Sequence, residues 1–167
     1  MTTKQKVFLV IWFYVGWFGC VFFGKWQLAE WSLIFPSVAL LLLITSKAAT
    51  KKQVMVLLLS AVVGLVFDAL ALRFGLISFP NPAITFVPLW LISMWLLFTT
   101  MVPVSHGLFK SNLLLAALLG AVFGPLSYYS GEAFEVFSFS NTKAIVIYAI
   151  FWGIYFPAIH YIYRKLT

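Results

Sequence analysis

Long apolar runs are the feature of this sequence that most constrains its fold. A transmembrane α-helix needs about 20 consecutive, predominantly apolar residues, and the 167-residue chain contains a succession of runs of about that length. They lie at about residues 7–24, 31–46, 53–72, 84–102, 113–130 and 144–163. Only 9% of the residues are charged, against about 25% in an ordinary soluble domain. We therefore predict an all-α polytopic membrane protein, in which residues 1–167 form a single domain of six transmembrane helices.

The distribution of charge predicts the orientation of these helices, because basic residues concentrate on the cytoplasmic side of membrane proteins. With six spans and a cytoplasmic N-terminus, the basic residues expected in the cytoplasm are Lys4, Lys6, Lys47, Lys51, Lys52, Lys110, Arg164 and Lys165, whereas Lys25, Arg73 and Lys143 fall outside. The acidic residues of the connections, Glu30, Glu132 and Glu135, also fall outside. Both termini are therefore expected in the cytoplasm. The net charge of +7 then reflects topology, and we expect no nucleic-acid partner because no dense basic tract is present.

Small residues at one-turn spacing predict which helix faces pack closely, because in lipid such residues let helices approach one another. The stripes are Gly16, Cys20 and Gly24 on the first span, Ser60, Gly64 and Asp68 on the third, and Gly120, Gly124 and Ser127 on the fifth. We expect the first, third and fifth helices to approach one another through these residues. Separate contacts between pairs of helices are the alternative.

Asp68 is the residue that most needs a partner, because a carboxylate at the centre of a membrane helix costs about 2.5–3.5 kcal/mol on insertion scales. It shares the small-residue face of its helix and lies at about the same depth as Ser127 and Tyr128. With Arg73 and Glu132, these residues predict a polar patch or cavity that opens outward and binds a ligand. The alternative is an interaction of Asp68 with Arg73 or with a hydroxyl group that only fixes helix packing.

Two further features border the expected cavity. Pro125 lies in the middle of the fifth span, where it cannot donate a backbone hydrogen bond, and this predicts a helix kink. On the sixth span, Tyr148, Trp152 and Tyr155 recur at the spacing of one helix face. This stripe fits simple filling of the core first; the other interpretation is that it lines the same cavity, with Tyr148 and Trp152 as the candidate lining residues.

The motifs of common enzyme chemistry are missing from the sequence. No metalloprotease, hydrolase, phosphate-binding or dinucleotide-binding pattern occurs. His106 and His160 lie far from the acidic residues, and we expect them to differ in depth by about two helical turns. Ser105 and His106 are neighbours with no acid nearby. We therefore predict no catalytic residues, no metal site and no cofactor.

The run GAVFGPLSYYSG at residues 120–131 resembles the signature of a family of small bacterial inner-membrane proteins, domain of unknown function twenty-eight seventy-eight. Shorter matching pieces are WFGC at residues 17–20, VFD at 66–68, GLI at 75–77 and PLW at 88–90. The resemblance implies a multi-pass protein of the bacterial inner (cytoplasmic) membrane with no established activity. Members of the family are sometimes encoded beside enzymes that modify fatty acids.

In its general plan the chain is also similar to the substrate-binding subunits of energy-coupling-factor vitamin transporters, and to the rod-shape protein that shares that plan. This second resemblance is one of architecture. It implies that ligand enters from outside and that Gly16, Cys20 and Gly24 meet a coupling subunit.

The sequence favours a non-catalytic integral membrane protein that binds a lipid or small amphipathic molecule in the outward-facing cavity, with a role in lipid modification or envelope maintenance. Three other functions stay open: a scaffold that recruits other membrane proteins, a transporter or its substrate-binding subunit, and a membrane-embedded lipid enzyme. Membrane lipids are the expected partners of a binder, and other membrane proteins those of a scaffold.

Overall fold

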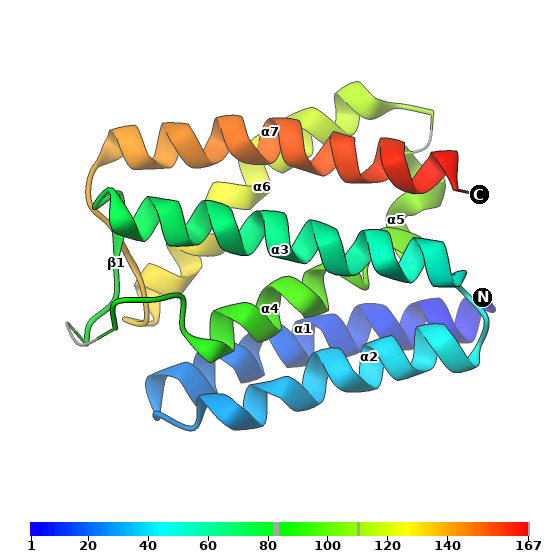
Figure 1. Ribbon diagram of the computed structural model, residues 1–167, viewed down its shortest axis with the longest axis horizontal. Coiled ribbons are helices and arrows are strands. Elements are labelled where there is room, and N and C mark those ends of the chain that lie inside the picture. The colour runs from blue at the N-terminus through cyan, green and yellow to red at the C-terminus, as the bar shows by residue number, and fades with distance from the viewer. Residues whose placement is uncertain (82–83, 110, 167) are drawn as a thin grey trace.

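The computed structural model describes residues 1–81, 84–109 and 111–166, and within them the protein is all-α apart from one pair of short strands (Figure 1). The helices are α1 (Thr3–Lys25), a 3₁₀ helix η1 (Ala29–Leu33) that leads directly into α2 (Ile34–Thr45), α3 (Lys51–Arg73), α4 (Leu89–Thr99), α5 (Val102–Phe109), α6 (Leu113–Ala133) and α7 (Thr142–Lys165). The strands are β1 (Ile77–Ser78) and β2 (Ser138–Phe139). The all-α class predicted from the sequence is confirmed.

Side-chain caps explain where the four longest helices begin. The first N–H groups of a helix have no partner inside the helix, so a side-chain acceptor just before it is stabilising. Thr2 and Thr50 accept such hydrogen bonds at the starts of α1 and α3, and in each case a glutamine three residues later completes a capping box. Asn112 and Asn141 cap α6 and α7 through their side-chain oxygens.

Four helices, α1, α3, α6 and α7, are long and apolar enough to cross a membrane. α4 and α5 together would form a fifth crossing, although the pair is bent by 46° at the break between them. The segment Ala29–Thr45, formed by η1 and α2, is apolar but shorter. The described residues therefore form a multi-pass membrane protein with four or five candidate spans.

The predicted span at residues 84–102 differs most from the structure, because its helix α4 covers only Leu89–Thr99. Pro88 takes an extended backbone (φ −70°, ψ 155°) and starts the helix. Pro103, near the beginning of α5, has no N–H to donate to the carbonyl of Thr99. The two prolines thus account for the late start of α4 and for the bend that follows it.

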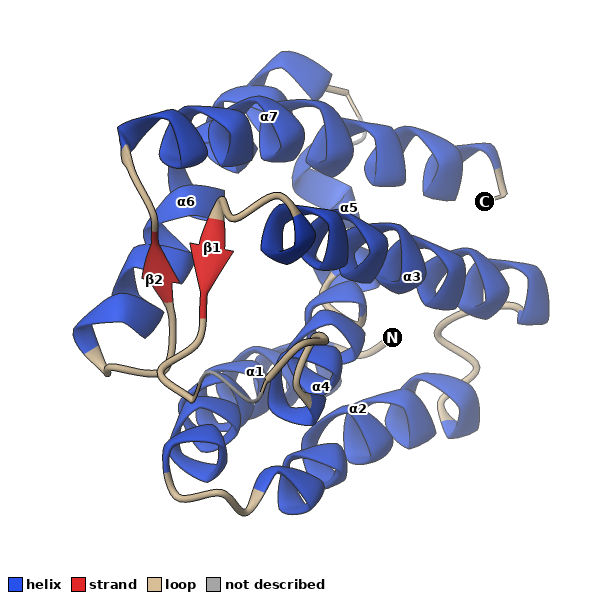
Figure 2. Cartoon of the chain, turned by 60° about the vertical axis from the view of Figure 1, so that its left-hand side comes forward, coloured by secondary structure: helices blue, strands red, loops and turns tan. Residues whose placement is uncertain are grey.

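α4 lies between α1, α2 and α3, whereas α6 packs along α7 (Figures 1 and 2). The small residues allow these helices to pack closely. At most of the glycines in the predicted stripes, an added Cβ would collide with a large side chain of a neighbouring helix. The facing pairs are Gly16 with Leu97, Gly24 with Trp90, Gly64 with Trp95, and both Gly120 and Gly124 with Trp152. The prediction that α1, α3 and α6 approach one another through their small residues is wrong. Gly16, Gly24, Gly64 and Gly124 instead make room for bulky side chains of α4 or α7, and Gly120 lies against the backbone carbonyl of Trp152.

The two strands join connections that are far apart in the sequence. Ile77 pairs with Phe139 and Ser78 with Ser138 in antiparallel register, so the α3–α4 connection is tied to the α6–α7 connection (Figure 2). The β1–β2 pair lies at one end of the bundle, and both termini lie at the opposite end (Figure 1). The strands and the buried Phe79 and Phe137 beside them cover the end of the bundle nearest Asp68.

Candidate functional site

The buried carboxylate of Asp68 is the centre of a hydrogen-bond network that links four helices. Asp68 lies on α3 and has none of its surface exposed. Its oxygens accept hydrogen bonds from the indole N–H of Trp95 on α4 (2.6 Å), from the hydroxyl of Tyr148 on α7 (2.7 Å) and from the hydroxyl of Tyr128 on α6 (2.9 and 3.1 Å). A buried carboxylate needs such donors to replace the water it has lost.

The structure brings together only part of the polar patch predicted around Asp68. Tyr128 and Tyr148 reach the carboxylate. Arg73 is exposed at the end of α3, and Glu132 is half-buried near the end of α6. Neither is a hydrogen-bond partner of Asp68 in the described part of the chain. The sequence left two packing partners open for Asp68, Arg73 and a hydroxyl group. In the structure, the hydroxyl groups of Tyr128 and Tyr148 are hydrogen-bonded to Asp68 and Arg73 is not.

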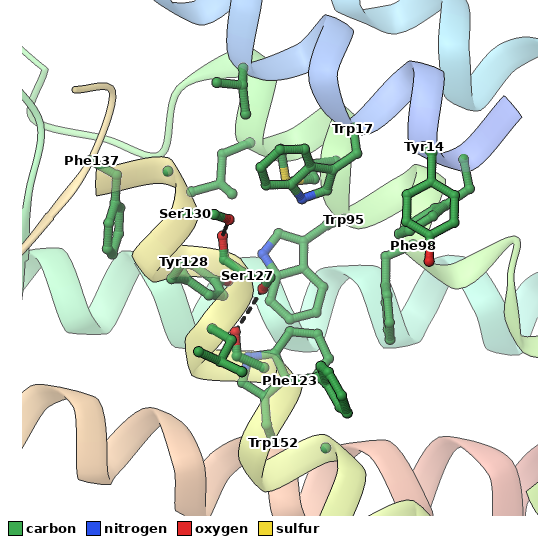
Figure 3. A pocket seen from close by; sticks show the side chains of 18 of the residues that line it. Tyr14, Trp17, Trp95, Phe98, Phe123, Ser127, Tyr128, Ser130, Phe137 and Trp152 are labelled. Atoms are coloured by element: carbon green, nitrogen blue, oxygen red, sulfur yellow. Dashed lines mark hydrogen bonds between the residues drawn. The ribbon is translucent and has the colours of Figure 1, made fainter. Parts of the chain in front are cut away.

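A cavity of about 780 Å³ lies next to this network (Figure 3). It is lined by side chains of α1, α4 and α6, with contributions from α5 and α7. Trp95 and Tyr128 belong both to its lining and to the Asp68 network, so their rings separate the carboxylate from the cavity. Its volume is within the range of about 300–1,000 Å³ that is typical of small-molecule sites.

The cavity opens between α1 and α6. Tyr14 and Phe18 on α1 and Phe123 and Leu126 on α6 line it, yet each of these side chains leaves more than half of its surface exposed. Both helices are candidate membrane spans. The opening therefore lies on the side of the helix bundle, between two apolar helices.

Aromatic contacts mark the two ends of the cavity. Phe18 packs edge-on against Phe134, just after α6, with ring centroids 6.2 Å apart. At the other end Phe109 of α5 packs against Phe156 of α7, with centroids 5.2 Å apart. Along α6 the lining extends from Leu119 to Phe134, which is about 22 Å at 1.5 Å per residue. The cavity is thus an elongated groove along α6.

Chemically, the lining is almost entirely aliphatic and aromatic. The described residues that line the cavity include no Asp, Glu, Lys, Arg or His. Its two serines direct their hydroxyl protons to the backbone of α6: Ser127 donates to the carbonyl of Gly124 and Ser130 to that of Ser127, both at 2.6 Å. The cavity therefore presents a neutral surface.

Trp152 forms part of the wall on the α7 side. Its side chain is only 6% exposed, and its indole nitrogen is buried with no hydrogen-bond partner in the described structure. Its ring lies parallel to that of Trp95, with centroids 5.1 Å apart and an angle of 5° between the planes. A Cβ at Gly124 would collide with the same ring. The indole is held in place with its donor unpaired.

Three of the predicted cavity residues, Ser127, Tyr128 and Trp152, line this cavity. Tyr148 is fully buried and lies with Asp68 behind the wall, and Arg73 and Glu132 are not part of the lining. Pro125 is buried inside α6, which continues through it as one helix from Leu113 to Ala133. A kink at Pro125 stays a prediction.

The wall contributed by α4 is absent from the predicted site. Leu91, Trp95 and Phe98 line the cavity and follow the i, i+4, i+7 spacing of one helix face. The same spacing on the sixth span led to Trp152. The helical spacing of the α4 residues was therefore visible in the sequence. Nothing in the sequence shows, however, that this face of α4 and the aromatic face of α7 border the same cavity.

His106 and His160 lie together at the end of the bundle that holds the termini. Their rings are stacked, with centroids 6.3 Å apart, and Ser105 Oγ lies 3.4 Å from His160 Nε2. The prediction that the two histidines differ in depth by two turns is wrong, because the bend between α4 and α5 brings His106 against α7. In the described residues, no three or more His, Cys, Asp or Glu side chains are grouped so that they could hold a metal ion.

Comparison with known proteins identifies one relationship. A family model described as "Protein of unknown function (DUF2878)" matches residues 6–158. Neither the curated proteins nor the solved structures contain a match.

Proposed function

This chain belongs to the DUF2878 family of proteins of unknown function, and from that premise we propose that it binds a lipid or small amphipathic molecule in the cavity between α1 and α6. The observation that carries the proposal is the cavity itself. It is large enough for a small molecule, apolar along its length and open to the side of the helix bundle.

The surroundings of the opening support a ligand that comes from the membrane. Exposed apolar side chains continue from the rim along both helices, as Ile11 and Phe22 do on α1 and Val122 does on α6. A molecule dissolved in the bilayer could enter between the helices without crossing a charged surface. Binding would bury apolar surface of the cavity wall and exclude lipid that packs less well against it.

We further propose six membrane crossings, with both termini in the cytoplasm of a bacterium. Two termini at the same end of the bundle are expected for an even number of crossings (Figure 1), and Ala29–Thr45 would supply the shortest of them. The described basic residues near that end are Lys4, Lys6, Lys47, Lys51, Lys52, Arg164 and Lys165. Lys110, assigned to the same side, lies outside the described residues. In the orientation that we propose, which follows the positive-inside rule, the cavity end near Phe134 would lie toward the outer leaflet of the inner membrane.

A membrane scaffold is the second candidate, since a helix of another protein could occupy the same groove. Gly120 and Gly124 would not carry such a contact, because both are already covered by Trp152 of α7. In this alternative the partner would instead meet the exposed rim at Phe18 and Phe123.

Native mass spectrometry of the protein released from mild detergent tests the proposal. The test variant is Ser127→Phe, which puts a ring into the cavity. The matched control is Ser37→Phe on α2, because Ser37 is an exposed helical serine whose hydroxyl likewise donates to its own helix backbone (2.7 Å).

We expect wild type and Ser37→Phe to carry a small molecule in a fixed ratio, and Ser127→Phe to lose it while keeping its helical content. An empty wild type, or a folded Ser127→Phe variant that retains the molecule, would overturn the proposal. Retention of a second polypeptide that Ser127→Phe releases would favour the scaffold.

A further inference from the structure

The negative charge of Asp68 lies behind the cavity wall and has no positive partner among the described residues. Resting on the proposed function, we propose that the ligand is a lipophilic cation, an amphiphile whose positive group is a quaternary ammonium or a similarly substituted amine. Its apolar part would occupy the groove, and its charge would lie against the wall formed by Trp95 and Tyr128.

The hydrogen bonds around Asp68 favour a carboxylate that carries its charge. An ionised carboxylate only accepts hydrogen bonds, and an indole N–H only donates. The two oxygens of Asp68 accept from Trp95, Tyr128 and Tyr148. A proton on Asp68 would take one of the oxygen sites that these donors use and would turn a tyrosine hydroxyl from donor into acceptor. Three donors around one carboxylate therefore stabilise the ionised form.

No cationic side chain in the described part of the chain offsets this charge. Arg73, on the same helix, is exposed, and the ion pair at 3.1 Å joins Lys25 to Glu135 instead. The described residues that line the cavity include no Lys, Arg or His. An opposite charge nearby stabilises a buried ion strongly, because an apolar region screens the attraction less than water does. A cation in the cavity would supply that opposite charge.

The two side chains between the carboxylate and the cavity are suited to a cation. Trp95 and Tyr128 donate to Asp68 at 2.6 and 2.9 Å, and both line the cavity (Figure 3). A hydrogen bond to an anion polarises its donor, so these rings become richer in electrons, and electron-rich aromatic rings attract cations. More than half of the described lining side chains are aromatic, against 19% of the whole chain.

The same features disfavour other amphiphiles. A fatty-acid carboxylate or a phosphodiester against this wall would meet a second negative charge, and an uncharged chain would gain apolar packing alone. A primary ammonium would bring three N–H donors that need acceptors, whereas a quaternary ammonium brings none. At an effective dielectric constant of about 20, the interaction of two unit charges about 10 Å apart changes an affinity on the order of 10-fold.

Binding of three matched amphiphiles tests this assignment. Hexadecyltrimethylammonium is the cation, 2,2-dimethyloctadecane is its neutral isostere with carbon in place of nitrogen, and hexadecyl sulfate is the anion. Affinities are measured by native mass spectrometry titration of the delipidated full-length protein in one non-ionic detergent. Asp68→Asn removes the buried charge, and Glu30→Gln removes one exposed charge as the control. Ser127→Phe places a ring in the cavity and so locates the binding.

We expect wild type to bind the cation on the order of 10-fold more tightly than the neutral isostere, and to bind the anion most weakly. The net charge of the protein is +7, so a nonspecific electrostatic effect would favour the anion instead. Asp68→Asn should remove most of the preference for the cation over its isostere, and Glu30→Gln should keep it. Ser127→Phe should weaken binding of the cation and of the isostere together.

Equal binding of the cation and its isostere by wild type, tighter binding of the anion, or an Asp68→Asn variant that keeps the full preference would overturn the assignment while leaving apolar binding intact. Failure of all three amphiphiles to bind wild type would instead overturn the proposed function.

If Asp68→Asn does not fold, wild type at two salt concentrations gives a second test. The Debye length falls from about 10 Å at 0.1 M salt to about 3 Å at 1 M, and buried charges are screened much less than exposed ones. The preference for the cation over its isostere should therefore persist at 1 M salt. A preference that disappears there would come from exposed acids and would reject Asp68 as its source.

Discussion

The indole N–H of Trp95 donates a 2.6 Å hydrogen bond to Asp68, and the same indole stacks on Trp152. A buried carboxylate on α3 therefore fixes an aromatic side chain on α4, which in turn supports the cavity wall on α7. This chain of contacts connects the membrane-buried acid to the cavity without exposing the acid to a ligand. Asp68 acts as a positioning residue in this arrangement.

Replacing Asp68 with asparagine should destabilise the protein. Asparagine has one acceptor oxygen and adds two donor hydrogens, so it cannot accept from Trp95, Tyr128 and Tyr148 together. Each donor left unpaired costs about 1–3 kcal/mol. Unfolding of Asp68→Asn in mixed micelles should show this loss, and Glu30→Gln, which changes an exposed acid, should leave the free energy of unfolding unchanged. Equal stability of Asp68→Asn and wild type would contradict the network.

Tyr148→Phe should remove one hydrogen bond to the carboxylate and keep the ring. A hydrogen bond to a charged group contributes about 1.5–3 kcal/mol, and we expect a loss of that size in the free energy of unfolding. In an Asp68→Asn background the same substitution should cost less, because the two residues act through one contact. Strict additivity would show that Tyr148 acts independently of Asp68. Tyr129→Phe, an exposed tyrosine of α6, is the control.

Gly124→Ala should force α6 and α7 apart. A Cβ at this position would overlap the Trp152 ring, and overpacking of this kind typically costs about 1–3 kcal/mol. Gly107→Ala in α5 is the matched control, because no atom lies within 4 Å of a Cβ added there, and alanine in a helix is more stable than glycine by about 0.5–1 kcal/mol. Thermal unfolding should therefore move in opposite directions for the two variants. A harmless Gly124→Ala would show that α6 is not closely packed on α7.

Introduced cysteines should be labelled from opposite sides of the membrane at Lys51 and Lys143. Both lysines are exposed, and they lie at the starts of α3 and α7. The native Cys20 is fully buried, so it should not react in the folded protein. With a membrane-impermeant maleimide on intact cells, Lys143→Cys should react at once and Lys51→Cys only after the membrane is permeabilised. Three crossings, α3, the α4–α5 pair and α6, separate the two lysines in the proposed topology. Three crossings put the lysines on opposite sides, so labelling of both from the same side would refute this topology.

The helical architecture could be predicted because each apolar run reports on its own surroundings. The runs that became α1, α3, α6 and α7 form helices in a bilayer because a helix satisfies its own backbone hydrogen bonds and apolar side chains favour hydrocarbon. Both requirements depend only on the residues of the run itself. The run at residues 84–102 was harder to predict, since α4 begins and bends at positions set by Pro88 and Pro103. Both prolines were visible in the sequence, but their effect depends on whether neighbouring groups can satisfy the freed backbone carbonyls.

The candidate site was less predictable, since it depends on which helices are neighbours. Ser127, Tyr128 and Trp152 were placed near a cavity from their depth and periodicity, and they line one. Arg73 lies at a sequence position from which it could have folded back toward Asp68, but its side chain is exposed. Trp95, which is central to both the network and the cavity, stood out in no motif, because an aromatic residue in an apolar run has no distinctive local pattern.

By itself, the sequence determined the class of the protein, the approximate positions of its helices and the need of Asp68 for buried partners. All three follow from the free energy of placing individual groups in hydrocarbon or water. Only the tertiary structure decided that Gly24, Gly64 and Gly124 receive tryptophan rings of α4 and α7, that three donors from three helices surround Asp68, and that α1, α4 and α6 enclose an apolar cavity. These outcomes depend on the shapes of surfaces brought together from distant parts of the chain, and packing of that kind has no local signature in the sequence.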